Sequence, residues 1–164
     1  MSPTTSKLLL DNYFIEELNC KVNFEHNPEL ASDISLKDIT VTADVLAGRK
    51  KSEGWQVRLT VFHQTEGESN SPYSFRIVLV GFFRVDDNYP TDRAEWLVKT
   101  NAPSVLYSIA RENIRRVTVD GPWRCVLLPT VSFYTDELKA LICKKSTKQS
   151  LPNGKKNRIG KDCP

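Results

Sequence analysis

Cysteine and histidine are the residue types of this chain that could hold a metal ion or supply a nucleophile. They are Cys20, Cys125, Cys143, Cys163, His26 and His63. No two cysteines have the C-x-x-C spacing of a zinc site. No histidine is separated from a cysteine by the spacing typical of zinc ligands. We therefore expect reduced, mostly buried thiols, with no metal and no cofactor. His63 falls among apolar residues of a strand pattern, so we expect it to be structural.

Catalytic motifs are missing from the sequence as well. The seven glycines are isolated, so none forms a phosphate-binding loop, and neither G-x-S-x-G nor H-E-x-x-H occurs. The paired carboxylates Asp86 and Asp87 fall in a turn between a strand pattern and a helix pattern, where solvated turn residues are common. We expect no catalytic residue, and we expect that the protein is not an enzyme.

Length and composition indicate one globular domain. The chain has 164 residues, of which 40% are hydrophobic and 26% are charged. The longest apolar run, residues 77–83, is far shorter than the roughly 20 residues of a transmembrane helix. The leucine run near the N-terminus is too short for the core of a signal peptide. We expect a cytoplasmic protein.

The net charge of +3 is unevenly distributed. From Lys144 onward there are seven basic residues and one acid, a charge of +6, which leaves −3 for residues 1–143. We expect a single domain over residues 1–145 and a basic, disordered tail over residues 146–164. The tail lacks the aromatic residues that stack on bases, which favours a solvated end over a nucleic-acid contact.

Alternating polar and apolar residues predict four strands, at residues 14–25, 38–48, 55–65 and 73–85. The first pattern has one interruption, at Glu16. The fourth becomes apolar on both sides over residues 77–83, so both of its faces should be covered, most simply by another subunit. Short connections favour pairing in sequence order, which gives an antiparallel meander.

A helix follows the strands. An apolar stripe at helical spacing is formed by Leu106, Ile109, Ala110, Ile114 and Val117. Asp92 and Glu95 have the spacing of a capping box, Pro103 should interrupt the helix, and Gly121 should end it. An extended crossover is expected at residues 123–133 and a short helix at 134–145. The fold class is α+β.

Several short motifs in the C-terminal third carry a family resemblance. They are Ala110, Arg111, Glu112 and Ile114 in the helix, then Gly121, then Pro129, Val131 and Phe133, then Leu138. Together they resemble the long helix, crossover and final helix of the SecB family of export chaperones. Residues 22–25 and Gly81 fit the same family, and the likeness covers about residues 12–142.

The resemblance implies a four-stranded antiparallel sheet with two helices, assembled as a dimer of dimers. It also implies an ATP-independent holdase that binds unfolded polypeptides in apolar grooves. The candidate groove residues are Phe14, Trp55, Phe75, Phe82, Phe83, Leu106 and Trp123.

The same resemblance implies docking on the SecA motor through acidic side chains of the outer sheet face. Lys21 and Arg76 fall on two of those positions, and Glu25 alone keeps the acidic charge. The resemblance also implies that SecA docks through a basic tail. Lys21 and Arg76 would repel that tail, so we expect poor SecA docking. General protein export and service to one dedicated client, such as an antitoxin, both stay open. So do two other classes: a domain that binds a small ligand, and an adaptor whose basic tail contacts nucleic acid.

Overall fold

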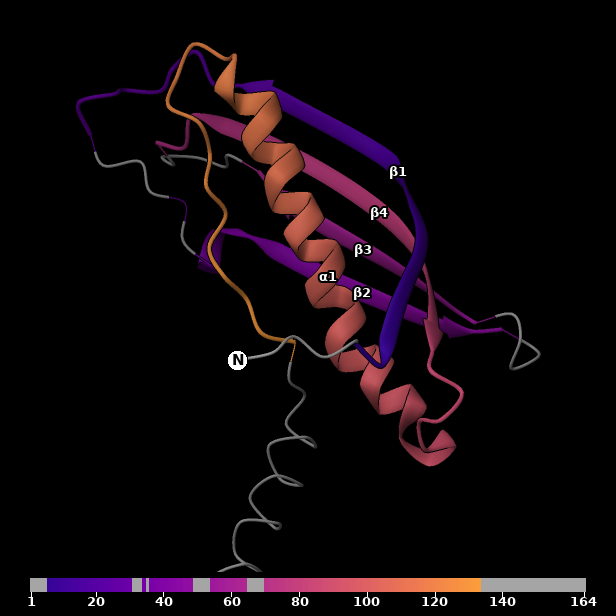
Figure 1. The fold of residues 1–164 in the computed structure, drawn as a ribbon. Coiled ribbons are helices and arrows are strands. Elements are labelled where there is room, and N and C mark those ends of the chain that lie inside the picture. Colours follow the sequence, from indigo (N-terminus) through magenta and orange to yellow (C-terminus); the bar gives the residue numbers. More distant parts are fainter. Residues whose placement is uncertain (1–5, 31–33, 35, 49–53, 65–69, 134–164) are drawn as a thin grey trace, which may run out of the picture. The chain divides into compact units, whose positions relative to one another are not determined.

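The structure, a computed structural model, describes residues 6–30, 34, 36–48, 54–64 and 70–133. Its elements are β1 (Leu8–Val22), the 3-10 turn η1 (Leu36–Asp38), β2 (Thr40–Ala47), β3 (Trp55–His63), β4 (Tyr73–Val85) and α1 (Thr91–Val119). α1 lies across one face of the four-stranded sheet, as Figure 1 shows. The expected second helix and the basic tail fall outside the described residues. No helix in those ranges has the length and apolar character to cross a membrane.

All strand pairs are antiparallel, and the order across the sheet is β1-β4-β3-β2. Strands β2, β3 and β4 form the expected meander. The prediction that β1 pairs with β2 is wrong, because β1 lies beside β4 instead. A strand that is apolar on both sides, like β4, is best placed with a neighbour on each edge. The long connection at residues 23–39 lets the chain cross to the far edge of the sheet.

Strand β1 contains two β-bulges, whose extra residues are Asp11 and Glu16. The interruption predicted at Glu16 is thus confirmed. A bulge moves the following residues to the opposite face of the sheet. Ile15 therefore shares with Leu18 the inner face, which α1 covers. Phe14 lies on the opposite, outer face, although simple alternation along residues 14–25 would place it on the same face as Leu18.

The core lies between α1 and the inner face of the sheet. Its fully buried helix residues are Val98, Ala102, Leu106, Ala110 and Ile114. Gly81 of β4 lies directly under the helix. A Cβ atom added there would stand 2.8 Å from Cδ2 of Leu106 and 2.9 Å from Cε2 of Phe83. Only glycine therefore lets α1 approach the sheet this closely.

Two helix predictions need correction. α1 begins at Thr91 after Pro90, and no side chain caps it, so Asp92 lies in the first turn instead of at the cap. Glu95 forms an ion pair with Lys99 at 2.6 Å instead of closing a capping box. An acidic side chain in the first turn still interacts favourably with the helix dipole. The predicted end of the helix is confirmed, since Asp120 is its C-cap.

Pro103 does not interrupt α1, which runs for 29 residues through it. Proline removes the hydrogen bond to the carbonyl of Lys99, four residues earlier. Lys99 is exposed, so water can take the place of that bond. Val98 on one side of the proline and Leu106 on the other are both completely buried against the sheet. Packing on both sides outweighs the lost hydrogen bond and holds the helix continuous.

The middle of the outer face of β4 is covered within the single chain, so the two valines there need no other subunit to cover them. Val78 and Val80 point away from α1 and are nevertheless 0% and 3% exposed. Arg58 of β3 donates to Glu16 of β1 from Nε at 2.8 Å and from Nη2 at 2.7 Å. β4 lies between those two strands, so the ion pair passes over its outer side chains.

Candidate functional site

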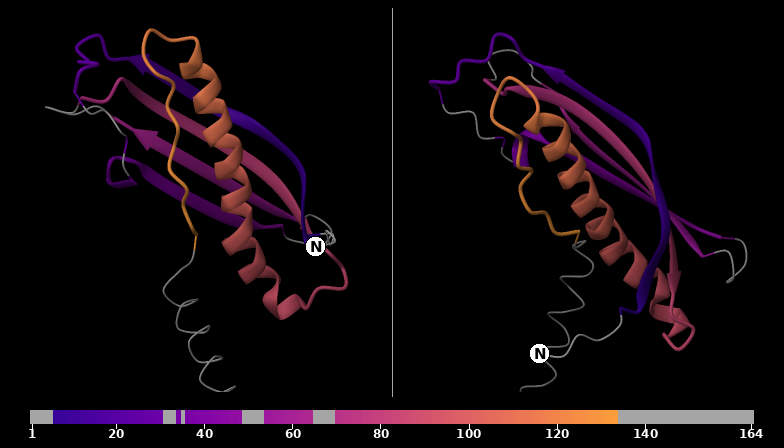
Figure 2. Two further views of the ribbon diagram at one scale, coloured as in Figure 1. Left: turned by 60° about the vertical axis from the view of Figure 1, so that its left-hand side comes forward. Right: turned by 45° about the horizontal axis from the view of Figure 1, so that its top comes forward.

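The segment that follows α1, residues 121–133, runs back beside the helix on the inner face of the sheet (Figures 1 and 2). Side chains alternate along it. Val126 and Leu128 are buried, whereas Cys125 and Leu127 are exposed, Leu127 to 69%. This alternation is that of an extended chain. The predicted crossover is therefore confirmed, and we call residues 121–133 the crossover segment.

Side chains of α1 fix the crossover segment in place. The bonds are Tyr107 Oη to Pro129 O at 2.8 Å, Arg111 Nε to Leu128 O at 2.9 Å, and Val126 N to Thr118 Oγ1 at 3.0 Å. Burial raises the pKa of the Tyr107 hydroxyl, which keeps it protonated as a donor. Each of these bonds joins a side chain to the backbone. The segment is thus anchored without being paired to another strand.

The turn between α1 and the crossover segment is held against the start of β4. The hydroxyl of Tyr73 accepts a hydrogen bond from the N–H of Trp123 at 3.2 Å and lies 3.2 Å from the carbonyl oxygen of the same residue. A Cβ atom at Gly121 would collide with that hydroxyl. The indole Nε1 of Trp123 donates to the carbonyl of Asn23 at 3.0 Å. These contacts fix the position of the Trp123 ring.

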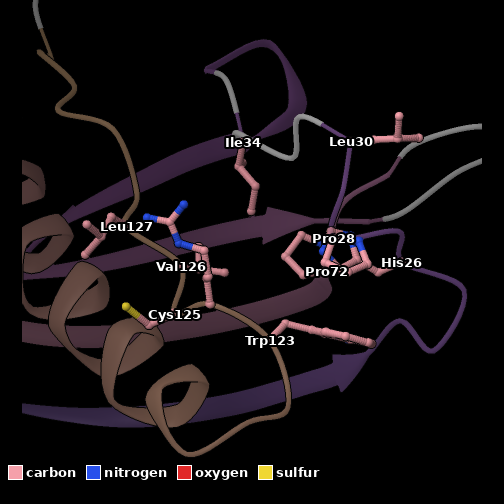
Figure 3. A pocket seen from close by; sticks show the side chains of 10 residues that line it. His26, Pro28, Leu30, Ile34, Pro72, Trp123, Cys125, Val126 and Leu127 are labelled. Carbon is pink, nitrogen blue, oxygen red and sulfur yellow. The ribbon is translucent and has the colours of Figure 1, made fainter.

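A pocket of about 400 Å³ opens beside this fixed turn (Figure 3). Its walls come from the β1–β2 connection, the start of β4 and the crossover segment. They are lined by His26, Pro28, Leu30, Ile34, Pro72, Trp123, Arg124, Cys125, Val126 and Leu127. The rings of His26 and Trp123 meet edge to face, 5.1 Å apart, and Nδ1 of His26 donates to the carbonyl of Asn70 at 2.7 Å. We call this cavity the crossover pocket.

The side chains of the crossover pocket are suited to binding an apolar group. Most lining side chains are aliphatic, proline or aromatic, and several are exposed, among them Leu30 at 58%. Within the described ranges, no three His, Cys, Asp or Glu side chains are grouped as metal ligands. Apolar walls open to solvent suit a partner's apolar side chains.

The two described cysteines behave differently. Cys125 is exposed at the crossover pocket, which corrects the expectation of a buried thiol. Cys20 is half-buried on the inner face of β1, and burial raises the pKa of its thiol. His63 is structural, as expected. Its ring is buried, with Nδ1 2.7 Å from the carbonyl of Asp38 and Nε2 2.8 Å from the hydroxyl of Ser71.

The residues predicted to line a groove are divided among several places. Trp123 lines the crossover pocket, and Trp55 lines a second pocket of about 800 Å³ at the other end of the sheet, near the start of α1. Phe14 and Phe82 lie together on the outer face, with ring centroids 6.2 Å apart, and are 47% and 37% exposed. The structure brings no more than one predicted residue to the crossover pocket.

Three predicted groove residues belong to the core, which corrects the prediction for them. Phe75, Phe83 and Leu106 are 2%, 1% and 0% exposed. All three lie in the core between α1 and the inner face of the sheet. Sequence reasoning missed Leu30 and Leu127, which line the crossover pocket. The signal for Leu127 is its place between Val126 and Leu128 in an extended segment, because alternation turns the middle residue outward.

Comparisons with known proteins agree with this architecture. The family described as "Preprotein translocase subunit SecB" matches residues 7–139. The chain belongs to the SecB family. Membership of this family supports a chaperone role in protein export, and it fits the expectation of a protein that is not an enzyme.

Curated relatives carry the name "Protein-export protein SecB". The chain is 28% identical to that of Nitrobacter hamburgensis over 116 residues, which are 68% of this chain and 72% of the relative. It is 30% identical to that of Rhodopseudomonas palustris strain BisA53 over 95 residues, 58% of either chain. Among solved structures, a Mycobacterium tuberculosis SecB-like chaperone in complex with an antitoxin peptide matches with a TM-score of 0.51 and 11% identity. That match covers 79% of this chain and 94% of the other, and it shows a shared fold.

Proposed function

We propose that this chain is an ATP-independent holdase, which binds unfolded polypeptides through the crossover pocket in the cytoplasm. The observation that supports this most directly is the exposed apolar wall of the pocket. Leu127 is 69% and Leu30 is 58% exposed, although each stands beside other apolar residues. Apolar side chains that stand open to water beside a pocket are available to the apolar side chains of a client.

Apolar burial explains how such a site binds without nucleotide. Removing apolar surface from water contributes about 25 cal/mol per Å² and does not depend on the order of residues in the client. The chain entropy that an unfolded client loses on binding opposes this gain. Binding is therefore reversible, as a holdase requires.

We propose a homo-oligomer, a dimer of dimers, with contacts along the free edge of β1. The inner-face residues Tyr13, Ile15 and Leu18 are 41%, 40% and 39% exposed within one chain. On α1, Val105 and Val117 are also partly exposed, at 39% and 42%. Apolar side chains beside an unpaired strand edge favour association with a second copy.

The outer face supports the proposal that SecA docks poorly. Arg76 donates from Nε to Glu17 at 2.9 Å and also lies 5.9 Å from the centroid of the Phe62 ring. Lys21 is exposed on the same face. This face is thus neutralised by its own basic residues, and a basic partner gains little from it. The client is a secretory precursor or a single dedicated protein. An antitoxin is one candidate, because the M. tuberculosis SecB-like chaperone was solved in complex with an antitoxin peptide.

Light scattering tests the proposed activity. An unfolded protein is diluted from urea into buffer with or without the chain, and no nucleotide is added. We expect the chain to suppress aggregation at ratios near one assembly per client. Unchanged aggregation at a tenfold excess of the chain would contradict the proposal.

A further inference from the structure

Arg124 is the one charged residue among those that line the crossover pocket. Its side chain is exposed, and within the described part of the chain it has no ion-pair or hydrogen-bond partner. Other arginines of the chain are paired: Arg58 with Glu16, and Arg84 with Asp11. A cation at the edge of an apolar pocket attracts an anion that arrives with an apolar group.

Glu25 and Glu29, which stand next to His26 and Pro28 in the sequence, do not line the pocket. Glu25 and Glu29 belong to the β1–β2 connection and are exposed. Their backbone N–H groups donate to the side chains of Asn23 and Asn27, which holds the connection in tight turns. Neither glutamate has an ion pair with Arg124. The charge that the described pocket wall presents is therefore positive.

The backbone of the crossover segment favours an extended ligand. The N–H of Val126 and the carbonyl of Leu128 are bonded to side chains of α1. In an extended chain the backbone groups of alternate residues point to opposite sides. Those of Cys125 and Leu127 therefore point away from α1. Among the described residues they have no backbone partner. An extended peptide could pair with them as an added strand.

We propose that the crossover pocket selects an extended peptide segment in which a carboxylate stands next to a large apolar residue. The apolar side chain enters the pocket beside Trp123, and the carboxylate pairs with Arg124. This specificity rests on the proposed holdase function and narrows its clients to acidic, apolar segments.

Two matched peptides test the selection by isothermal titration calorimetry. Both are acetylated and amidated, with the sequence Ser-Gly-Asp-Leu-Trp-Leu-Asp-Gly-Ser or the same sequence with asparagine in place of both aspartates. An exposed ion pair contributes about 0.2–1 kcal/mol, so we expect the aspartate peptide to bind roughly 1.4-fold to fivefold more tightly at low salt. In about 1 M salt, where charges are screened beyond about 3 Å, the preference should disappear.

Variants of the full chain separate the pocket from general charge. In Arg124→Gln the preference for the aspartate peptide should be lost while the asparagine peptide binds as before, and in Arg124→Glu the preference should reverse. Arg93→Gln is the matched control, because it removes the same charge at the start of α1, away from the pocket. There the preference should stay.

The outcomes distinguish this selection from the holdase function. Equal binding of both peptides by the unaltered chain would overturn the selection and leave the holdase proposal intact. A preference that survives Arg124→Gln would overturn the role of Arg124. If neither peptide binds at millimolar concentration, peptide binding by the pocket is itself wrong, and the selection is wrong with it.

Discussion

Arg58 on β3 and Glu16 on β1 are joined by two hydrogen bonds that span the intervening strand β4, at 2.8 Å and 2.7 Å. Glu16 can reach Arg58 because Glu16 is the extra residue of a β-bulge. The other bulge residue, Asp11, accepts two hydrogen bonds from Arg84 of the neighbouring strand β4, at 2.6 Å and 2.7 Å. Each bulge thus supplies a carboxylate to an arginine of another strand.

We predict that Glu16→Gln lowers the free energy of unfolding at neutral pH and makes that free energy less sensitive to a fall in pH. The hydrogen bonds from Arg58 hold the pKa of Glu16 below its ordinary value of 4.5. A carboxylate whose pKa is lower in the folded state than in the unfolded state stabilises the fold above pH 4.5. This stability is lost as the pH falls through the lowered pKa. The variant lacks this carboxylate, so its free energy of unfolding should fall less between pH 6 and pH 3. Urea denaturation of the variant and of the unaltered chain at pH 6 and pH 3 measures this change in the free energy of unfolding.

The control is Glu29→Gln, which removes an exposed carboxylate without an ion pair in the described structure. Its free energy of unfolding should follow that of the unaltered chain at both pH values. An equal loss in the Glu16 and Glu29 variants would mean that the pair across β4 stabilises nothing.

Sequence patterns located the strands and the helix because local periodicity depends on which face is buried. The order of the strands could not be predicted in the same way. Pairing between β1 and β4 joins residues about 70 positions apart, such as Leu10 with Phe83. A local pattern carries no information about which edge a strand joins. The two-sided apolar run in β4 was the available signal, and it was interpreted as a subunit contact.

The candidate site was predicted less well than the fold. Large aromatic residues were chosen by type, yet type alone does not separate the core from the surface. Phe83 and Phe82 are neighbours, but one is 1% and the other 37% exposed, because adjacent strand residues point to opposite faces. The bulge at Glu16 also places Phe14 on the face opposite to the one that simple alternation with Leu18 gives. Sequence order alone cannot show which side chains are exposed.

We predict that Gly81→Ala destabilises the fold by about 1–3 kcal/mol, since the added methyl overlaps Leu106 and Phe83. Leu106→Ala alone should cost about 2–5 kcal/mol through the cavity that it leaves. The double variant should be more stable than the sum of both losses implies, because the new methyl fills part of the cavity. Chemical denaturation of the three variants measures this. Strict additivity would contradict the close contact.

We predict that Ile15→Lys breaks the assembly along β1. The side chain is 40% exposed, so the substitution leaves the fold intact but puts a charge on the proposed contact. Light scattering coupled to size-exclusion chromatography should show a mass smaller than that of the assembly formed by the unaltered chain. Leu46→Lys, at a 61% exposed position on the outer face, should leave the mass of the assembly unchanged. Loss of assembly in both variants, or in neither, would contradict a contact at β1.

Thiol reactivity provides an independent probe of the crossover pocket. With Cys143 and Cys163 replaced by serine, Cys125 should react with a thiol reagent faster than Cys20. Cys125 is exposed, whereas burial raises the pKa of Cys20 and reduces its thiolate fraction. An unfolded client should slow the reaction of Cys125 and leave that of Cys20 unchanged. Protection of neither thiol would argue against client binding at this pocket.

Two leucine variants test most directly whether the crossover pocket binds unfolded polypeptide. Leu127→Ser and Leu46→Ser each remove one exposed leucine, at 69% and 61% exposure. Of these two leucines, only Leu127 lines the pocket. The measurement is the concentration of chain that halves the aggregation of a client diluted from urea. We predict a severalfold higher concentration for Leu127→Ser and an unchanged one for Leu46→Ser. Equal activity of Leu127→Ser and the unaltered chain would contradict the account.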